Sequence, residues 1–244
     1  MTLLAIDTSS AYASIALHDG RSVIAEETWL AHRRHDDTLF PRVEALLAGS
    51  GVDVASLRLI AVAIGPGSFT GVRVGIAAAQ GMARGSGARV IGVETLDVIA
   101  HPFAALGIRV CAIVPAGRGE HYAGMYRMRR GTFSRTTPIL VGTVADLARR
   151  VALDTLFAGE IDEATAAELR SALGERAIVP SQSALARRAG HLAELGWARA
   201  AEGAAVDPAA LEPLYVRPPA VRGPGGALVG DTRLAPVASA LRGG

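Results

Sequence analysis

The 244-residue sequence contains no lysine and no asparagine, so all 25 of its basic residues are arginine. Without lysine the chain cannot form the lysine contact of a P-loop, a Schiff base or a Ser-Lys dyad. Its single cysteine, Cys111, lies in an apolar run, which excludes an internal disulfide and fits a reducing compartment. The net charge is only +2 and the arginines are dispersed, so a dedicated nucleic-acid surface has little support.

Long apolar runs are also lacking. The stretches "LIAVAI" and "VCAIV" are bounded by Arg, Gly or Pro and fall far short of the roughly eighteen residues that a membrane helix needs. The N-terminal residues show no basic region followed by a long apolar segment, so no secretory signal is visible. Because hydrophobic residues still make up 50% of the chain, we expect a soluble, cytoplasmic, globular protein without membrane contact.

The order of the predicted elements indicates two α/β lobes. Residues 1–105 are expected to hold three antiparallel strands, a helix, a buried strand, a second helix and a further strand. Residues 106–220 repeat the order of strands followed by helices, although no residue-level repeat is visible. Residues 221–244 are rich in Gly, Ala and Pro and are expected to form a flexible tail.

The first predicted helix has one apolar stripe, made of Leu39, Phe40, Val43, Leu46 and Leu47. Asp36 or Asp37 is expected to cap it, which would place Pro41 in the first turn, where proline is tolerated.

The segment "GPGSFTGVRVGIAAAQGMA", residues 65–83, carries five glycines in a predicted turn and helix. It is not a Walker A loop, because that motif needs a lysine, and Gly71 comes one residue too late for the dinucleotide fingerprint. The free N–H groups of residues 67–70 could still form an unspecialised anion site.

The same glycines can also be explained by packing. A glycine inside a helix costs about 0.5–1 kcal/mol relative to alanine, so these residues need a structural reason. Gly71, Gly75 and Ala79 lie among apolar residues in a sector wider than packing on one sheet requires. The extra area either meets only the neighbouring helix of the same lobe, or both helices form a surface for a partner.

Other candidate sites have simpler explanations. His32 and His35 precede two aspartates, but this spacing lacks the geometry of a helical zinc pair, and helix capping explains the carboxylates. The hydroxyls of the segment 7–9 (Asp7, Thr8 and Ser9) could contact phosphate, yet such residues also form an ordinary turn. No serine lies in a G-x-S-x-G motif, so a hydrolase triad has no support.

Three stretches together resemble one family. They are "LLAIDTSSAYASIAL", "HDDTLFPRVEALL" and "GPGSFTGVRVGIAAAQGMARG…VIGVETLDVIA". They closely resemble the TsaB family of bacterial tRNA threonylcarbamoyladenosine biosynthesis proteins. The first lobe is similar almost throughout, and the second only through "RGEHYAGMY" and "LEPLYVRPP".

The resemblance implies a two-lobed fold of the actin-like ATPase superfamily, in which each lobe is a mixed sheet flanked by helices. It also implies a relationship to TsaD, which transfers threonylcarbamoyl to the adenosine beside the anticodon. TsaD-like enzymes carry a His-x-x-x-His metal pair, and Thr95 and Ile99 stand at the matching positions here. The metal site and catalysis are therefore expected to be absent, and no cofactor is expected.

The resemblance further implies an accessory subunit that binds a TsaD-like enzyme as a heterodimer, with a TsaE-like ATPase as an additional partner. Contact with tRNA would be made through the complex, and a homodimer would form without the partner. We expect the partner surface on the two first-lobe helices, at Phe40, Val43, Leu47, Gly71, Val72, Gly75, Ile76 and Ala79.

A nucleotide role is weakened by two departures from the superfamily pattern. Asp7, Thr8 and Ser9 lack the glycine of an Asp-Gly turn and would be at most a vestigial phosphate contact. In the second lobe Pro115 stands where relatives usually have an aspartate. The alternative functions are an active ATP-dependent phosphotransferase or ATPase that uses the interlobe cleft and, with less support, a glycoprotease.

Overall fold

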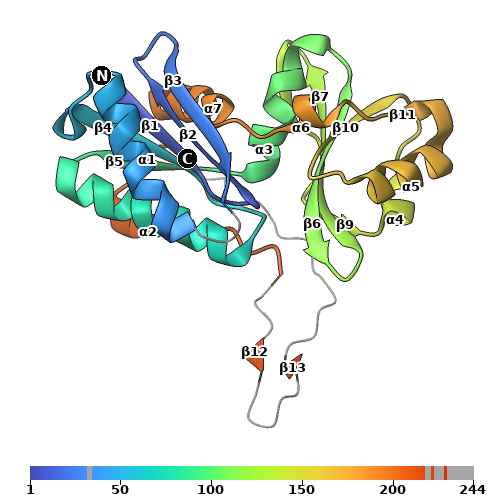
Figure 1. The fold of residues 1–244 in the computed structure, drawn as a ribbon. Helices are drawn as coiled ribbons and strands as arrows, with labels where there is room; N and C mark the ends of the chain where they lie inside the picture. The colour runs from blue at the N-terminus through green and yellow to red at the C-terminus, as the bar shows by residue number, and fades with distance from the viewer. Residues whose placement is uncertain (32–34, 218–220, 223–227, 230–244) are drawn as a thin grey trace.

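The computed structural model describes residues 1–31, 35–217, 221–222 and 228–229. It consists of two α/β lobes that lie side by side (Figure 1). The first lobe contains a five-stranded sheet formed by β1 (Thr2–Asp7), β2 (Tyr12–His18), β3 (Val23–Leu30), β4 (Leu57–Ala63) and β5 (Arg89–Val93). The first three strands are antiparallel, as predicted, and β4 and β5 are parallel to β1.

The second lobe repeats this topology. Its strands are β6 (Arg109–Gly117), β7 (Glu120–Arg129), β8 (Thr132–Arg135), β10 (Thr155–Gly159) and β11 (Ala177–Ile178), with β9 (Leu140–Gly142) beside β7. The order β8-β7-β6-β10-β11 matches the order β3-β2-β1-β4-β5 of the first sheet, with the same directions. The lobes therefore share a topology that the sequence does not show as a repeat.

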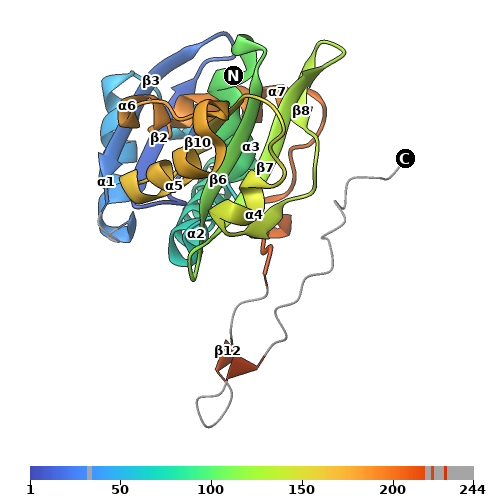
Figure 2. The same cartoon turned by 90° about the vertical axis from the view of Figure 1, so that its right-hand side faces the viewer.

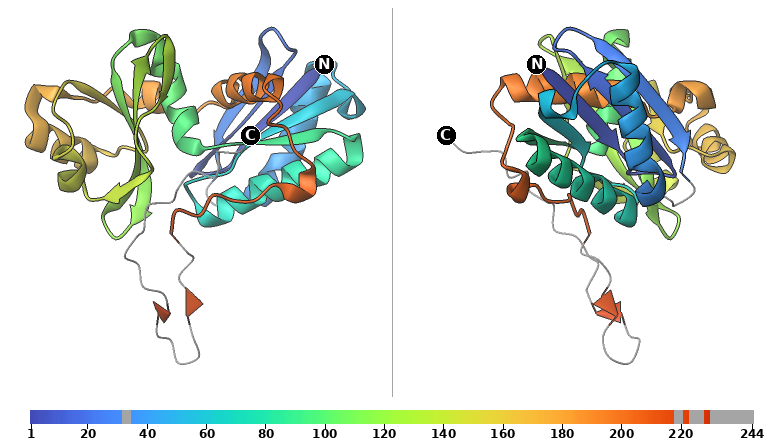
Figure 3. Two further views of the ribbon diagram at one scale, coloured as in Figure 1. Left: turned by 180° about the vertical axis from the view of Figure 1, so that it is seen from behind. Right: turned by 60° about the vertical axis from the view of Figure 1, so that its left-hand side comes forward.

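Helices cover both faces of the first sheet. The helices α1 (His35–Gly49) and α2 (Phe69–Ser86) pack on one face, and α7 (Ala189–Ala201) packs on the other (Figures 1 and 3). Although α7 lies in the segment 106–220 assigned from sequence to the second lobe, it packs mainly on the first sheet. At Gly196 the absent side chain permits this approach, because a Cβ there would lie 2.6 Å from the Cβ of Ala61.

The start of α1 differs from the prediction. The helix begins at His35, so Asp36 and Asp37 lie in its first turn and Pro41 lies in its interior, where its missing N–H removes one bond of the helix ladder. Contacts with β3 hold the helix in place. The indole N–H of Trp29 donates to the hydroxyl of Thr38 at 3.2 Å, and the Arg42 guanidinium lies 4.8 Å from the centroid of the Trp29 ring.

The second lobe has its own core beneath α4 (Val144–Ala148) and α5 (Glu163–Leu173). Helix α3 (Thr95–Ala100) and the 3-10 turn η2 (His101–Leu106) lie where the lobes meet (Figures 1 and 2). From α6 (Gln182–Leu185) the chain returns to the first lobe as α7.

The last described residues form a small strand pair between β12 (Val221–Arg222) and β13 (Leu228–Val229). The rest of the predicted tail lies outside the described residues. Among the described helices, none is long and apolar enough to cross a membrane.

Candidate functional site

The residues that end β1 lie buried between the lobes. Asp7, Thr8 and Ser9 are at most 2% exposed. A carboxylate oxygen of Asp7 accepts the backbone N–H of Ser9 at 2.8 Å and its hydroxyl at 2.6 Å, and the Thr8 hydroxyl donates to the Gly71 carbonyl at 2.7 Å. The Thr8 and Ser9 hydroxyls and one carboxylate oxygen of Asp7 are therefore bonded to the chain itself, while the other oxygen, Oδ2, has no hydrogen-bond partner among the described residues.

Arg187, between α6 and α7, crosses from this site to the second lobe. Its side chain is 6% exposed, and its Nε lies 3.8 Å from the Oδ2 of Asp7. Its two terminal nitrogens donate to the Ser9 hydroxyl and to the carboxylate of Glu160, which follows β10, each at 3.1 Å. Burial raises the pKa of Glu160, and the nearby guanidinium opposes that effect. One arginine thus joins both lobes across the cleft.

A bare phosphate is disfavoured in this arrangement. The negative charge of such a phosphate would be repelled by the carboxylates of Asp7 and Glu160. Its binding to Arg187 would have to compete with the ion pairs that this arginine forms with both residues. The two departures noted from sequence are also present, since Thr8 in place of a glycine follows Asp7, and Pro115 in place of an aspartate lies in β6. Asp7, Glu160 and Arg187 form an ion-pair cluster at this place.

A cavity of about 380 Å³ lies between the lobes, where the turn at residues 65–67 faces the end of β6. Residues 214–217 border it and link the lobes, since the guanidinium of Arg217 donates to the carboxylate of Glu120 at 2.6 Å. On the α2 side the Arg73 guanidinium lies 3.6 Å from the Phe69 ring centroid and donates to the Tyr215 hydroxyl at 2.8 Å.

The glycines at the start of α2 are explained by contact with β1. A Cβ at Gly67 would lie 2.3 Å from the Ser9 carbonyl oxygen, and one at Gly71 would lie 2.0 Å from that of Thr8. At Gly75 the distance to the Thr8 hydroxyl oxygen would be 2.5 Å. Because such distances are not tolerated, the row of small residues is an internal contact of the first lobe.

This packing corrects the predicted partner surface. Of its eight residues only Phe40 is exposed, at 51%. The other seven are buried and form part of the first-lobe packing: Val43, Leu47, Gly71, Val72, Gly75, Ile76 and Ala79. Helical periodicity identified an apolar sector correctly, but it could not tell which part meets the sheet and which part meets solvent.

The opposite sides of α1 and α2 form what we call the outer helix face, made of Phe40, Ala48, Ala77, Gly81 and Gly85. All five are exposed, and the two helices lie side by side (Figure 3, right). A Cβ at Gly81 or Gly85 would meet nothing within 4 Å among the described residues. These two helical glycines therefore have no internal packing reason.

Comparison with known proteins decides the family. A family model described as TsaD, tRNA N6-adenosine threonylcarbamoyltransferase, matches residues 27–193. The solved structure titled YeaZ from Pseudomonas aeruginosa is 30% identical, with a TM-score of 0.72 over 88% of this chain and 99% of that one.

The chain belongs to the TsaD family, and within it to TsaB.

Curated relatives named tRNA threonylcarbamoyladenosine biosynthesis protein TsaB agree with this assignment. The relative from Escherichia coli K12 is 40% identical over 52% of this chain and 55% of its own length. The relative from Bacillus subtilis 168 is 29% identical over 80% of this chain and 87% of its own length. The chain thus spans about half the length of the first of these relatives and most of the second.

The predicted two-lobed actin-like fold is confirmed. A more distant structure, the activator of 2-hydroxyisocaproyl-CoA dehydratase from Clostridium difficile with bound ADPNP, has a TM-score of 0.50 at 11% identity and shares the fold alone.

Thr95 and Ile99, which stand at the positions matched to the TsaD metal pair, have buried side chains. Thr95 is fully buried and donates to the Ser9 hydroxyl at 3.3 Å, and Ile99 packs into the second-lobe core. The other histidine pair considered from sequence, His32 and His35, involves side chains outside the described residues.

Sequence reasoning missed the ionic contacts that join the TsaB lobes. Arg187 is one example, and a second cluster centres on Asp97 of α3, which accepts the Tyr126 hydroxyl at 2.6 Å and pairs with Arg199 of α7. Burial, reinforced by Asp97, holds the pKa of Tyr126 well above its usual range. Residues this far apart in sequence carry no local signal of their pairing.

Proposed function

We propose that this chain is a non-catalytic subunit in the synthesis of threonylcarbamoyladenosine in tRNA, and that it binds a TsaD-like transferase as a heterodimer. The outer helix face is the proposed contact surface. The observation that carries the proposal is the division of α2, whose buried glycines contact Thr8 while Gly81 and Gly85 meet nothing in the described structure. Each of these two exposed helical glycines lowers helix stability by about 0.5–1 kcal/mol relative to alanine, and each allows another backbone to approach closely.

The composition of the outer helix face supports a protein partner. Phe40 provides a large exposed apolar side chain on α1, and Ala48 and Ala77 are small exposed residues on α1 and α2. An exposed aromatic residue beside small residues can enter a pocket on a partner with little steric conflict. Without the transferase, the same surface would pair two copies of this chain.

Three features support a subunit without its own chemistry. The acidic residues of the cleft are paired with Arg187, and the metal positions carry Thr95 and Ile99. Burial raises the pKa of the only thiol, Cys111, to about 12, so the reactive thiolate is scarce near neutral pH. We propose that catalysis belongs to the TsaD-like partner, with a TsaE-like ATPase and tRNA joining through the complex.

The substitution Ala77→Arg tests the contact surface. It places a long charged side chain on the outer helix face without entering the lobe, and we expect at least a 100-fold loss of affinity for the TsaD-like enzyme in calorimetry. Ala167→Arg is the matched control, because Ala167 is an exposed alanine on α5 of the second lobe. Circular dichroism should show both variants folded. Unchanged binding by Ala77→Arg, or a loss caused by Ala167→Arg instead, would overturn the assignment.

A further inference from the structure

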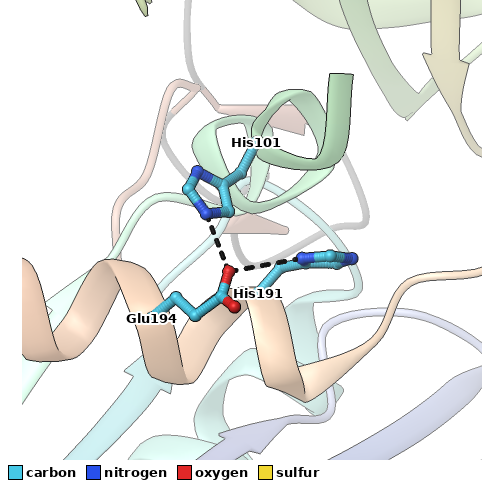
Figure 4. A group of neighbouring side chains, drawn as sticks. All are labelled: His101, His191 and Glu194. Carbon is cyan, nitrogen blue, oxygen red and sulfur yellow. Dashed lines mark hydrogen bonds and ion pairs between the residues drawn. The ribbon is translucent and has the colours of Figure 1, made fainter. Parts of the chain in front are cut away.

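Two histidines and a glutamate meet where the lobes join, at a place that the proposed function does not use. His101 begins η2, and His191 and Glu194 lie one turn apart on α7 (Figure 4). The Nε2 of His101 lies 3.0 Å from a carboxylate oxygen of Glu194, and the Nδ1 of His191 lies 3.7 Å from the same oxygen. Their potential ligand atoms all lie within 4.8 Å of one another.

The backbone fixes these side chains relative to each other. Residues three apart on a helix share a face, so His191 and Glu194 point to the same side of α7. The chain then brings His101 to them from 93 residues away. Figure 4 shows the Glu194 carboxylate between the two rings, which meet it from different elements.

We propose that His101, His191 and Glu194 form a binding site for a divalent transition metal, with Zn²⁺ as its best fit. Two imidazole nitrogens and one carboxylate oxygen form a donor set that zinc accepts, whereas Mg²⁺ and Ca²⁺ prefer oxygen ligands alone.

The spacing requires only small movements. A tetrahedral zinc ion with bonds of about 2.0–2.2 Å separates its ligand atoms by roughly 3.3 Å. The two distances to the Glu194 oxygen, 3.0 and 3.7 Å, are close to this value, and all three ligand atoms lie within 4.8 Å of one another. Each of the three side chains is partly exposed, which leaves room for a water molecule as the fourth ligand.

The surrounding charge is compatible with a cation. The nearest basic side chain on the same segment, Arg188, forms an ion pair with Glu26 of β3, and its Nε donates to that carboxylate at 2.9 Å. Because Glu26 offsets the positive charge of Arg188, the negative charge of Glu194 can offset the positive charge of the metal ion.

A bound metal would join the lobes. Helix α7 packs on the first sheet, while α3, directly before His101, packs on β6, β7 and β10 of the second lobe. One ion held from both sides would act as a cross-link at the surface, in addition to the contacts of Arg187 and Asp97.

Zinc chloride titrated into the metal-free full-length chain tests the site, with calorimetry and thermal melting as readouts. We expect one zinc ion per chain, a higher melting temperature and no comparable response to magnesium or calcium. His101→Gln, His191→Gln and Glu194→Gln should each weaken zinc binding by at least tenfold. Glu202→Gln, an exposed carboxylate at the end of α7, is the matched control and should bind as the parent does.

A second control separates this site from the other histidine pair. The double variant His32→Gln/His35→Gln should keep full zinc affinity. The proposal is wrong if the parent chain binds no zinc, or if binding survives in all three site variants. It is also wrong if binding disappears in the His32/His35 variant instead.

Discussion

The interlobe cleft and the outer helix face differ in what their side chains contact. In the cleft, Arg187 donates to Ser9 and Glu160 and forms an ion pair with Asp7, so one buried cation contacts all three groups. On the outer helix face, Gly81 and Gly85 have no neighbour in the described structure and Phe40 is half exposed. The contrast teaches that the polar groups of the cleft face a buried cation of the same chain, whereas the outer helix face carries residues that the described structure leaves uncovered.

Removing the arginine of the cleft should have the largest effect on stability. Arg187→Met leaves Asp7 buried without its cation and also frees Glu160, so we expect a loss of about 3 kcal/mol in the free energy of unfolding. Urea denaturation measures it. Arg170→Met, which breaks the exposed pair with Glu163, should change stability by about 1 kcal/mol at most. Equal effects of the two variants would show that Arg187 does not hold the cleft closed.

The two sides of α2 should respond with opposite signs to the same substitution. Gly75→Ala places a methyl group 2.5 Å from the Thr8 hydroxyl oxygen, which is itself bonded to Gly71, and should destabilise the protein by about 1–3 kcal/mol. Gly81→Ala meets open space and should stabilise it by about 0.5–1 kcal/mol. Thermal melting distinguishes the signs, and a stabilising Gly75→Ala would refute the internal contact. A bulkier Gly75→Leu would disturb folding and would therefore not test docking.

A smaller effect is expected on the pH dependence of the free energy of unfolding, to which Glu160 of the cleft should contribute. The pKa of Glu160 is raised in the folded chain, so this group takes up its proton at higher pH when folded than when unfolded. Protonation of Glu160 therefore favours the folded state as the pH falls from neutral toward the pKa of this residue in the unfolded chain. The variant Glu160→Gln should lack this gain in the free energy of unfolding. Unfolding free energies of parent and variant between pH 7 and 5 measure the difference. A parent that loses stability relative to Glu160→Gln over this range would contradict the assigned direction.

Local sequence patterns predicted much of the fold but only part of the candidate site. Apolar strand patterns predicted β1 to β6, and the glycine-rich segment was correctly assigned to a turn and a helix. Periodicity could not decide what faces Gly71 and Gly75, because the answer depends on Thr8, more than sixty residues earlier. The return of α7 to the first lobe and the approach of Arg187 to Asp7 depend on the tertiary path of the chain.

Hydrogen–deuterium exchange of the full-length chain, with and without its TsaD-like enzyme, tests the central claim most directly. The account predicts slower exchange in residues 35–49 and 69–86, which form α1 and α2, and unchanged exchange in residues 163–173 of α5. Protection confined to the second lobe, with α1 and α2 exchanging as in the free chain, would contradict the account.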